Sequence, residues 1–349
     1  MWPEERLTVP HILGVPKLSV IITCFNYSKF VEQAIRSVQA QDYGNIECIV
    51  IDDMSNDGSA QIIEKVLADM QDSRFTFVKL EKNVGQTLSM VAGLDRTSAP
   101  FVAFLDADDF WSEDFVSRHI AVHLSANSVV GMSCCDMKSI NEDGEIIGST
   151  QMSLRKPRTL TSNLKRRIIP VALPAAAFTN PDLVKREDVD CFCYEQAFPA
   201  RWRFAPTSAA VYRRELVNIL IPRHASRRVK NPDYLLGLLC SSFAGYISID
   251  SASAYYRLHG KNIMSKNPFT GGKYWMSGPW NRADSAVMAK HMIKAVVENY
   301  KPLKNIYGHW FTVFNLLRVG WSAPIRAIWM ALKLSVFYLI WEDRSPRQA

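Results

Sequence analysis

Short apolar runs alternate with segments of helical spacing over the first 110 residues, and this alternation constrains the fold more than any other feature. The runs are Leu18–Thr23, Ile46–Ile51, Phe75–Leu80 and Phe101–Leu105. Between them, apolar residues recur every three or four positions over Phe30–Val38, Ser59–Met70 and Gln86–Asp95. A β-α-β-α-β-α-β order of this kind predicts an α/β fold, with a parallel sheet covered by helices on both faces.

Segments that contain polar residues stand at the ends of three of the four predicted strands. They are Thr23-Cys24-Phe25-Asn26, Asp52-Asp53 and Asp106-Ala107-Asp108-Asp109. In an open sheet of this class the ligand lies beyond the carboxyl ends of the strands. No Gly-x-Gly-x-x-Gly follows the first strand and no Walker-type loop occurs, which argues against a dinucleotide-binding domain. A site that is lined by carboxylates and lacks such a loop can bind a phosphate group only with a divalent cation between the carboxylates and the phosphate.

The second part of the chain is less regular. We expect a helix at Phe115–Leu124, a strand at Val129–Ile140 and a hairpin turn at Asn141–Gly144. Further expected elements are a strand running into a helix at Thr207–Arg214, a helix at Pro232–Ser242, and strand segments at Tyr246–Ile249 and Ala254–Leu258. Residues 284–341 are predicted to be mostly helical, with breaks at Pro302 and Pro324.

Over residues 17–265 the chain resembles the family 2 glycosyltransferases of the GT-A fold. The resemblance is carried by SVIITCFN, IVIDDMSNDGS, NVGQTLSMVAGL, FVAFLDADDFW, NPDYLLGLLCSSFAGYISID and YYRLHGKNIMS, in that order. It implies a Rossmann-like, mostly parallel sheet flanked by helices. Residues 1–16 are then a loose leader, 17–110 the nucleotide-sugar-binding half and 111–265 the acceptor-binding half of one catalytic domain. Residues 266–349 form a mostly helical C-terminal extension.

The resemblance also implies inverting transfer of a sugar from a nucleotide-sugar donor, with Mn²⁺ or Mg²⁺ as cofactor. Phe25 would stack on the base, and Asp53 would bind the imide edge of uracil or thymine. The full set of implied donor-binding residues is Thr23, Phe25, Asp52, Asp53, Asn83, Gly85, Asp106 and Arg257. For the pair Asp52-Asp53 a turn role stays open, as it does for the loop at Asn83 and Gly85.

Asp106-Ala107-Asp108 matches the Asp-x-Asp of the family. The resemblance makes Asp108 the metal ligand, together with His259 and Asp106, and it makes Asp233 the general base. Pro232 stands where family members often have Glu, and an N-cap role for Asp233 stays open. Trp202 is the candidate for stacking on an acceptor sugar, although a core position fits it equally well. Asp109 is expected to cap the helix near Ser112.

The function expected from these residues is metal-dependent, inverting transfer from a UDP-sugar or TDP-sugar to a hydroxyl of a glycan or lipid-linked acceptor. Cell-surface polysaccharide biosynthesis is the expected setting. Two alternatives are a nucleotidyltransferase on a similar sheet and a non-catalytic nucleotide-sugar-binding module. His119 and His123 have the i,i+4 spacing of a zinc pair, but no third ligand is near in sequence. No nucleic-acid recognition module accompanies the basic runs, so no nucleic-acid partner is expected.

Charge is divided unevenly along the chain. Residues 1–150 hold 11 basic and 22 acidic residues, a net charge of −11, whereas residues 301–349 carry +5. The scattered cysteines and the lack of an apolar signal core near the start predict a cytoplasmic protein. Ala327–Trp341 would be about 22 Å long as a helix, which is too short for a bilayer core of about 30 Å.

Tryptophans and basic residues alternate in the C-terminal tail, residues 309–341, where the basic residues are Arg318, Arg326 and Lys333. This pattern is typical of a helix that lies in the headgroup region of an anionic leaflet. We therefore expect peripheral contact with the inner face of the cytoplasmic membrane. Packing of these helices on the catalytic domain, or a homodimer interface between them, is the alternative.

Overall fold

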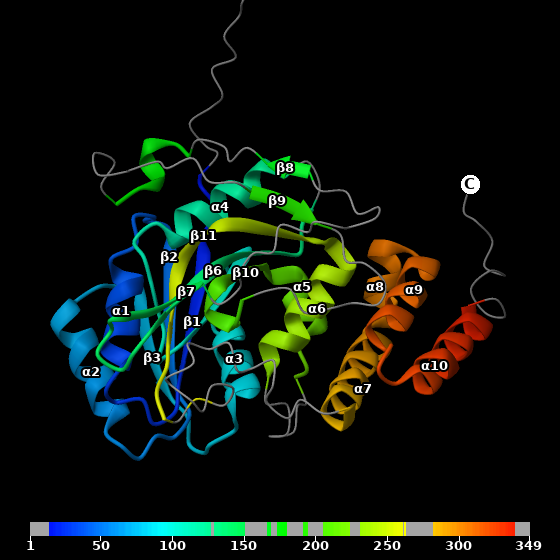
Figure 1. Ribbon diagram of the computed structural model, residues 1–349, viewed down its shortest axis with the longest axis horizontal. Coiled ribbons are helices and arrows are strands. Elements are labelled where there is room, and N and C mark those ends of the chain that lie inside the picture. The colour runs from blue at the N-terminus through cyan, green and yellow to red at the C-terminus, as the bar shows by residue number, and fades with distance from the viewer. Residues whose placement is uncertain are drawn as a thin grey trace, which may run out of the picture.

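The computed structural model describes residues 14–126, 129–150, 166–168, 173–179, 191–194, 205–223, 231–260, 262 and 282–338. Its strands are β1 (Leu18–Cys24), β2 (Ile46–Asp52), β3 (Phe75–Lys79), β4 (Phe101–Asp106), β5 (Phe110–Trp111), β6 (Met132–Ile140), β7 (Ile146–Thr150), β8 (Arg166–Ile168), β9 (Cys191–Tyr194), β10 (Ala210–Arg213) and β11 (Tyr246–Arg257). They form one mixed sheet in the order β3-β2-β1-β4-β10-β6-β11-β9-β8, with β5 beside β11 and β7 beside β6 (Figure 1).

The helices cover this sheet and extend beyond it. They are α1 (Val31–Gln39), α2 (Ser59–Met70), α3 (Gln86–Leu94), α4 (Phe115–Ser125), α5 (Arg214–Leu220), α6 (Pro232–Ala244), α7 (Arg282–Glu298), α8 (Tyr300–Tyr307), α9 (His309–Val319) and α10 (Pro324–Phe337). The α/β class predicted from the alternating pattern is confirmed.

The first four strands are parallel. β1 pairs with β2 on one side and with β4 on the other, and β2 pairs with β3. Every residue of β1 is buried, as expected of an apolar strand covered on both faces. The chain moves outward from β1 to β3 and then crosses back to β4. Right-handed crossovers therefore place α1 and α2 on one face and α3 on the other (Figure 1).

The second half of the sheet is mixed. β10 pairs antiparallel with both β4 and β6, whereas β11 is parallel to β6 and antiparallel to β5 and β9. The sequence predicted two strand segments, Tyr246–Ile249 and Ala254–Leu258, where the structure has one strand of 12 residues. The pairing of β11 with β6 is irregular between Ser248 and Ala254. The polar residues of this stretch interrupt the apolar pattern, so the sequence predicted two segments.

The predicted division of the chain at residue 110 falls inside this continuous sheet, because β4 of the first half lies next to β10 of the second half. The structure therefore joins the two halves through strand pairing and not through a linker. The division itself stays a prediction about which half binds donor and which binds acceptor. Most of the expected leader lies outside the described residues.

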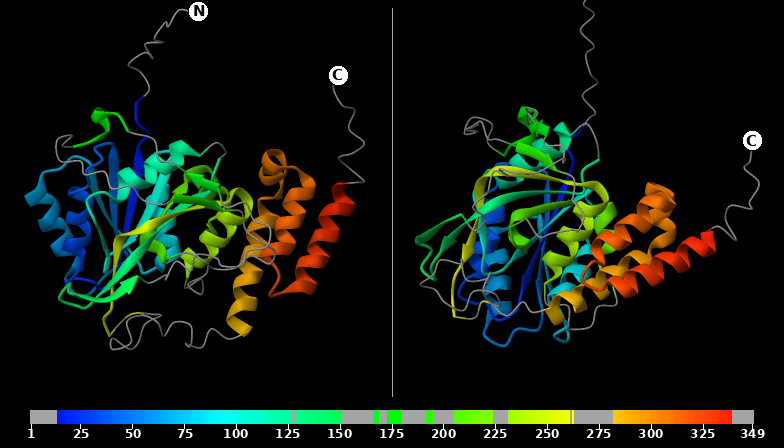
Figure 2. Two further views of the ribbon diagram at one scale, coloured as in Figure 1. Left: turned by 45° about the horizontal axis from the view of Figure 1, so that its top comes forward. Right: turned by 45° about the vertical axis from the view of Figure 1, so that its right-hand side comes forward.

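The C-terminal helices pack side by side at one end of the molecule (Figure 2). α9 contacts α6, α7, α8 and α10, whereas α10 contacts α9 and α7. Pro324 is the first residue of α10, as predicted, but Pro302 lies in the first turn of α8, which begins at Tyr300. A proline is tolerated in a first turn because the N–H groups there have no helical partner. No helix among the described residues is long and apolar enough to cross a bilayer.

His119 and His123 belong to the core and not to a metal site. His119 Nδ1 lies 2.6 Å from Ser133 Oγ, and His123 Nε2 lies 3.4 Å from Val211 O. Both side chains are buried, and His123 packs on the ring of Phe101. Among the described residues, the group able to hold a metal ion does not include either histidine. The zinc alternative therefore has no support.

These two histidines should make the fold sensitive to acid. Burial, with help from nearby Arg118 and Arg213, lowers the pKa of His119 well below its usual range and that of His123 to about 3. Unfolded histidines take up protons near pH ~6.5. The unfolded state then binds more protons, so the free energy of unfolding falls as the pH drops below that value, by up to about 1.4 kcal/mol per pH unit for each histidine.

Chemical denaturation at pH 7, 6 and 5 measures this slope. His123→Leu removes one of the two titrating groups, so the slope below pH 6 should become shallower by as much as about 1.4 kcal/mol per pH unit. An identical slope in the wild type and the variant would contradict the assignment of a buried neutral His123.

Candidate active site

The carboxyl ends of β1, β2 and β4 meet at one edge of the sheet. Thr23 of β1 pairs with Ile51 of β2 and with Asp106 of β4. Cys24, one residue further on, pairs with Asp52. The polar segments that follow these three strands therefore begin side by side, as the topology requires.

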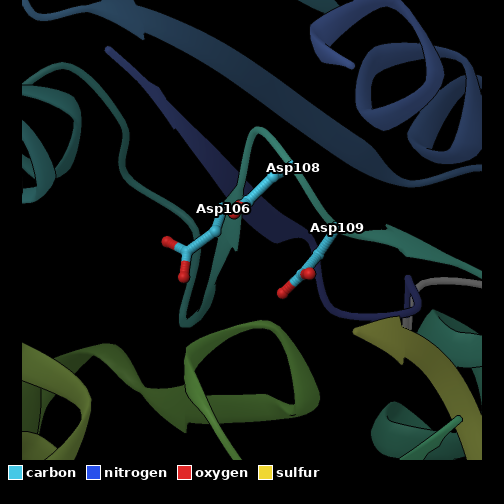
Figure 3. Close-up of side chains that lie close together, drawn as sticks. All are labelled: Asp106, Asp108 and Asp109. Atoms are coloured by element: carbon cyan, nitrogen blue, oxygen red, sulfur yellow. The ribbon is translucent and has the colours of Figure 1, made fainter. Parts of the chain in front are cut away.

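An acidic cluster stands at the end of β4. One carboxylate oxygen from each of Asp106, Asp108 and Asp109 lies within 4.8 Å of the others (Figure 3). A backbone hydrogen bond from Asp109 N to Asp106 O, 3.0 Å long, closes the turn that carries them. Asp108 and Asp109 are buried and Asp106 is partly exposed. The predicted cap role of Asp109 is wrong, because α4 begins at Phe115 and Asp109 points into this cluster.

Residues from distant parts of the chain hold the cluster in place. Gln86 Nε2, at the start of α3, donates to Asp106 Oδ1 over 2.7 Å. The Ser208 hydroxyl accepts from Asp106 N and donates to Asp109 Oδ2 over 2.7 Å. The backbone N–H of Arg257 donates to the other Asp109 oxygen over 3.0 Å. The cluster is therefore built where the parallel and antiparallel parts of the sheet meet.

The cluster concentrates negative charge. Burial and the charge of Asp108 raise the pKa of Asp106 and of Asp109 well above the usual range. Asp233 raises the pKa of Asp106 further. Three carboxylates with this mutual repulsion form a set of hard oxygen donors, the kind that Mg²⁺ and Mn²⁺ prefer. The residues fit the divalent cation predicted from the sequence.

His259 lies against the same cluster. Its Nε2 atom is 2.9 Å from Asp108 Oδ2, and its ring packs against the rings of Tyr27 and Phe30. Burial, and then the charges of Asp108 and Asp106, raise the pKa of the Tyr27 hydroxyl. The structure thus brings together the three residues predicted to bind metal, Asp106, Asp108 and His259. Their roles as ligands stay predictions.

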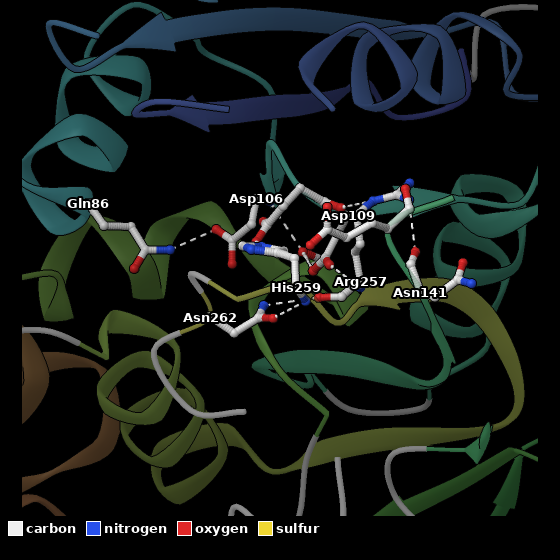
Figure 4. A network of polar contacts seen from close by, with 10 residues as sticks. Gln86, Asp106, Asp109, Asn141, Arg257, His259 and Asn262 are labelled. Carbon is white, nitrogen blue, oxygen red and sulfur yellow. Dashed lines mark hydrogen bonds and ion pairs between the residues drawn. The ribbon is translucent and has the colours of Figure 1, made fainter. Parts of the chain in front are cut away.

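Arg257 connects the cluster to two other segments (Figure 4). Its Nε donates to Asp108 O over 3.0 Å, and Nη1 donates to Asn141 O and Glu142 O over 3.1 and 2.7 Å. Nη2 donates to the side-chain oxygen of Gln33 in α1. The side chain is 2% exposed. Because protein oxygens occupy four of its five N–H donors, this geometry favours a positioning role over the donor-binding role predicted from the sequence.

Arg257→Lys tests these two roles. Lysine cannot reproduce the forked geometry, so buried carbonyl oxygens lose their donors, and we expect a loss of about 2–4 kcal/mol in the free energy of unfolding. Chemical denaturation measures this loss, and calorimetric titration with UDP measures nucleotide binding. Weaker UDP binding at unchanged stability would instead favour direct contact between Arg257 and the donor.

Asp53 shapes the loop after β3. Its two carboxylate oxygens accept hydrogen bonds from Val84 N and Gly85 N over 2.7 and 2.8 Å, and Asn83 Nδ2 donates to its backbone carbonyl. Gly85 has φ +85°, in the region that favours glycine. The structure therefore gives these residues the turn role and leaves the base-binding role of Asp53 as a prediction.

The remaining predicted donor residues differ in exposure. Asp52 is fully buried and accepts from Ser55 N over 3.0 Å, which favours its turn role. Thr23 is 8% exposed at the end of β1, and the Phe25 ring is 44% exposed just beyond it. An exposed ring at this position is available for stacking. Trp202, the predicted acceptor residue, lies outside the described residues.

Asp233 lies in the first turn of α6, one residue after Pro232. The N-cap residue of this helix is Asn231, so the prediction that Asp233 is the N-cap is wrong. Asp233 Oδ1 accepts a hydrogen bond from Tyr234 N over 2.8 Å within the first turn. Burial raises the pKa of Asp233. The charge of Asp233 contributes to the raised pKa of Asp106, so Asp233 lies near the acidic cluster.

Sequence reasoning missed three residues that build the site. They are Asp109, Gln86 and Ser208. The third carboxylate in Asp106-Ala107-Asp108-Asp109 is a visible signal for Asp109. Gln86 begins a helix next to the flagged Asn83-Val84-Gly85 loop, which is a weaker signal. Nothing in the sequence near Ser208 marks it, because its role depends on the pairing of β10 with β4.

The chain is similar to known glycosyltransferases. Residues 19–186 match Glycosyl transferase family 2. An uncharacterized glycosyltransferase of Nostoc sp. is 28% identical over 247 residues, 70% of this chain and 66% of the relative. The putative teichuronic acid biosynthesis glycosyltransferase TuaG of Bacillus subtilis is 33% identical over 30% of this chain and 41% of its own. The Campylobacter jejuni GalNAc(5)-diNAcBac-PP-undecaprenol beta-1,3-glucosyltransferase is 38% identical over 27% of this chain and 30% of its own.

The fold also has solved counterparts. The crystal structure of S. aureus TarS 1-349 in complex with UDP-GlcNAc has a TM-score of 0.52 and 15% sequence identity, covering 90% of this chain and 83% of that one. At this identity the likeness concerns the fold. The fold is that of the GT-A class of glycosyltransferases. The chain belongs to glycosyl transferase family 2.

Proposed function

We propose that this enzyme transfers a sugar, with inversion, from a UDP-sugar or TDP-sugar to a hydroxyl of a glycan or lipid-linked acceptor in cell-surface polysaccharide biosynthesis. The observation that carries the proposal is the acidic cluster at the end of β4, with the buried carboxylate of Asp233 near enough for its charge to raise the pKa of Asp106. Membership of the family favours glycosyl transfer over the nucleotidyltransferase and binding-module alternatives.

Asp233 supplies the base in the proposed reaction. Its carboxylate takes the proton of the acceptor hydroxyl while the new bond forms to the anomeric carbon of the sugar. The bond from that carbon to the diphosphate breaks on the opposite face, and its electron pair leaves with the nucleoside diphosphate. Burial raises the pKa of Asp233 and so makes it a stronger base than an exposed aspartate.

Asp108, Asp106 and His259 would hold the divalent cation, which supplies positive charge to the diphosphate leaving group. Gln86 and Ser208 keep the carboxylates of Asp106 and Asp109 in fixed orientations before any ligand binds. This preorganisation spares the site from reordering charged side chains during the reaction.

The acceptor class rests on the named relatives. Their printed names refer to teichuronic acid biosynthesis and to an undecaprenol diphosphate-linked glycan. An acceptor of this kind is carried by a membrane, so the enzyme would act at the inner face of the cytoplasmic membrane, as a peripheral protein. A homodimer through the C-terminal helices is the competing arrangement.

Donor hydrolysis tests the proposed function. The full-length protein is incubated with a panel of nucleotide sugars, with and without Mn²⁺, and release of the nucleoside diphosphate is measured. Slow release that needs the metal and one class of donor supports the proposal. Binding detected by thermal shift without any release, over the whole panel, would indicate a binding module. Formation of pyrophosphate from a nucleoside triphosphate and a sugar phosphate would indicate a nucleotidyltransferase.

A further inference from the structure

Both faces of α10 are apolar, but one is buried and the other is exposed to solvent. Ala327 and Ala331 are 1% and 6% exposed and form its inner face, where α10 packs on α9. Large apolar side chains face away from the protein, each between 52% and 85% exposed. They are Ile325, Ile328, Trp329, Leu332 and Val336, which we call the outer stripe.

The helical period explains why these five residues form one stripe. They are spaced by three, one, three and four positions, so they return to the same side of the helix over three turns. A monomer in water is stabilised by the reverse arrangement, with large apolar residues inside and alanines outside. A contiguous apolar surface of this kind marks a site that contacts something other than water.

Packing on the catalytic domain anchors α9, although Trp310, Phe311 and Phe314 of this helix are 63%, 41% and 44% exposed, and it does not cover the outer stripe. The Phe311 ring of α9 lies 6.3 Å from that of Phe243 in α6. Arg318 Nη1 donates to Ser242 O over 3.0 Å, so this residue, predicted from the sequence to belong to a membrane-facing pattern, instead ties α9 to α6. α9 and its neighbours thus form a base that holds α10 outermost at this end of the molecule (Figure 2).

The charged residues of the segment that carries the stripe are all basic. From residue 299 to residue 341 the sequence contains five basic residues and no acidic one. Arg326 and Lys333 are exposed, and they lie about two turns apart on the same flank of the stripe. Lys333 Nζ lies 5.4 Å from the Trp329 ring. Long basic side chains beside apolar ones can place their stems in an apolar phase and their charges among anionic headgroups.

Tryptophan enriches the same region. Trp329 is 59% exposed within the stripe, and Trp321, in the turn before α10, is 56% exposed. Indole rings favour the boundary between hydrocarbon and water, because one edge is polar and the ring is apolar. A protein partner would not require this combination of exposed indoles with an uninterrupted positive charge.

We propose that α10 docks on an anionic lipid bilayer, with the outer stripe in the acyl-headgroup boundary and with Arg326 and Lys333 on the headgroups. The helix lies in the plane of the surface, because its 14 residues are too few to span a bilayer. The proposal concerns binding alone and does not depend on the sugar-transfer reaction.

Vesicle sedimentation with the full-length protein tests the docking. Vesicles of phosphatidylcholine alone are compared with vesicles that contain phosphatidylglycerol, at low and high salt. We expect binding to the anionic vesicles that weakens with salt, since the screening length shortens from about 10 Å at 0.1 M to about 3 Å at 1 M. Equal binding to neutral vesicles, or no binding to either kind, would overturn the proposal.

Two double variants that introduce negative charge on α10 test whether this helix is the surface that binds the vesicles. Trp329→Glu/Leu332→Glu and Arg326→Glu/Lys333→Glu should each reduce the partition coefficient by more than about 10-fold. Neither should lower the unfolding temperature, because the altered side chains are exposed. Ile146→Glu, at a residue 60% exposed on β7, is the matched control and should bind like the wild type.

The competing occupant is a second copy of the chain. Light scattering of the full-length protein, with and without Trp329→Glu/Leu332→Glu, distinguishes the two. A monomer in both cases, with vesicle binding lost only in the variant, supports membrane docking. A wild-type dimer that the variant converts to monomer, together with no vesicle binding by the wild type, assigns the stripe to a homodimer and refutes the proposal.

Discussion

Asp233→Asn is expected to lower turnover by about 10²- to 10⁴-fold, the usual contribution of a positioned base. Asparagine retains an oxygen for the hydrogen bond from Tyr234 N but cannot accept the acceptor proton. The fold, nucleotide binding and metal binding should therefore persist. Steady-state turnover, UDP titration and thermal unfolding of the same preparation separate these effects.

The matched control is Asp69→Asn, an equally conservative change at an exposed residue of α2. It should change none of the three measurements. If Asp233 only supports the start of α6, its variant should lose about 1 kcal/mol or less of stability and keep its turnover, because asparagine is a good residue at helix starts. That outcome would remove Asp233 from the mechanism.

Asp108→Asn is expected to abolish activity through loss of metal binding. Removing one carboxylate from the cluster should weaken Mn²⁺ binding by at least about 10- to 100-fold, the range seen when even supporting residues of metal sites are changed. The charge of Asp108 raises the pKa of both Asp106 and Asp109, so its removal relieves repulsion between buried acids. Without metal, the variant should be at least as stable as the wild type.

Titration of Mn²⁺ in the presence of UDP, followed by thermal unfolding, checks both parts of this prediction. The stability of the wild type should rise with the logarithm of the Mn²⁺ concentration once this exceeds the dissociation constant, and that of Asp108→Asn should not. Asp250→Asn, an exposed acid on β11, is the control. Retained metal affinity and turnover in Asp108→Asn would exclude Asp108 as a ligand.

The parallel half of the fold could be predicted from the sequence because its signals are local. β2, α2 and β3 agree with their predicted segments to within one residue, since apolar runs and helical spacing are set by near neighbours. The mixed half could not be predicted in the same way. β5 has two residues and β10 has four, and their pairing depends on partners at least 76 residues away.

The candidate site shows the same division. The three acids at the end of β4 stand together in the sequence, so a cation site was predictable there. The contacts of Arg257 were not, because Gln33 and Asn141 come to it from two other segments. Short motifs identify which residues face the ligand edge. They do not indicate which of these residues already bind one another.

Because the chain is synthesised from its N-terminus, the aspartates of the acidic cluster are made before the residues that hold them in place. Ser208, Arg257 and His259 follow their aspartate partners by 99, 148 and 151 residues. At roughly 5–20 residues per second, the four parallel strands leave the ribosome many seconds before these partners exist. The parallel half of the nascent chain can therefore form its sheet early, while its aspartates still lack the hydroxyl, amide and imidazole that fix them. The acidic cluster can therefore reach its final geometry only after most of the chain has been synthesised.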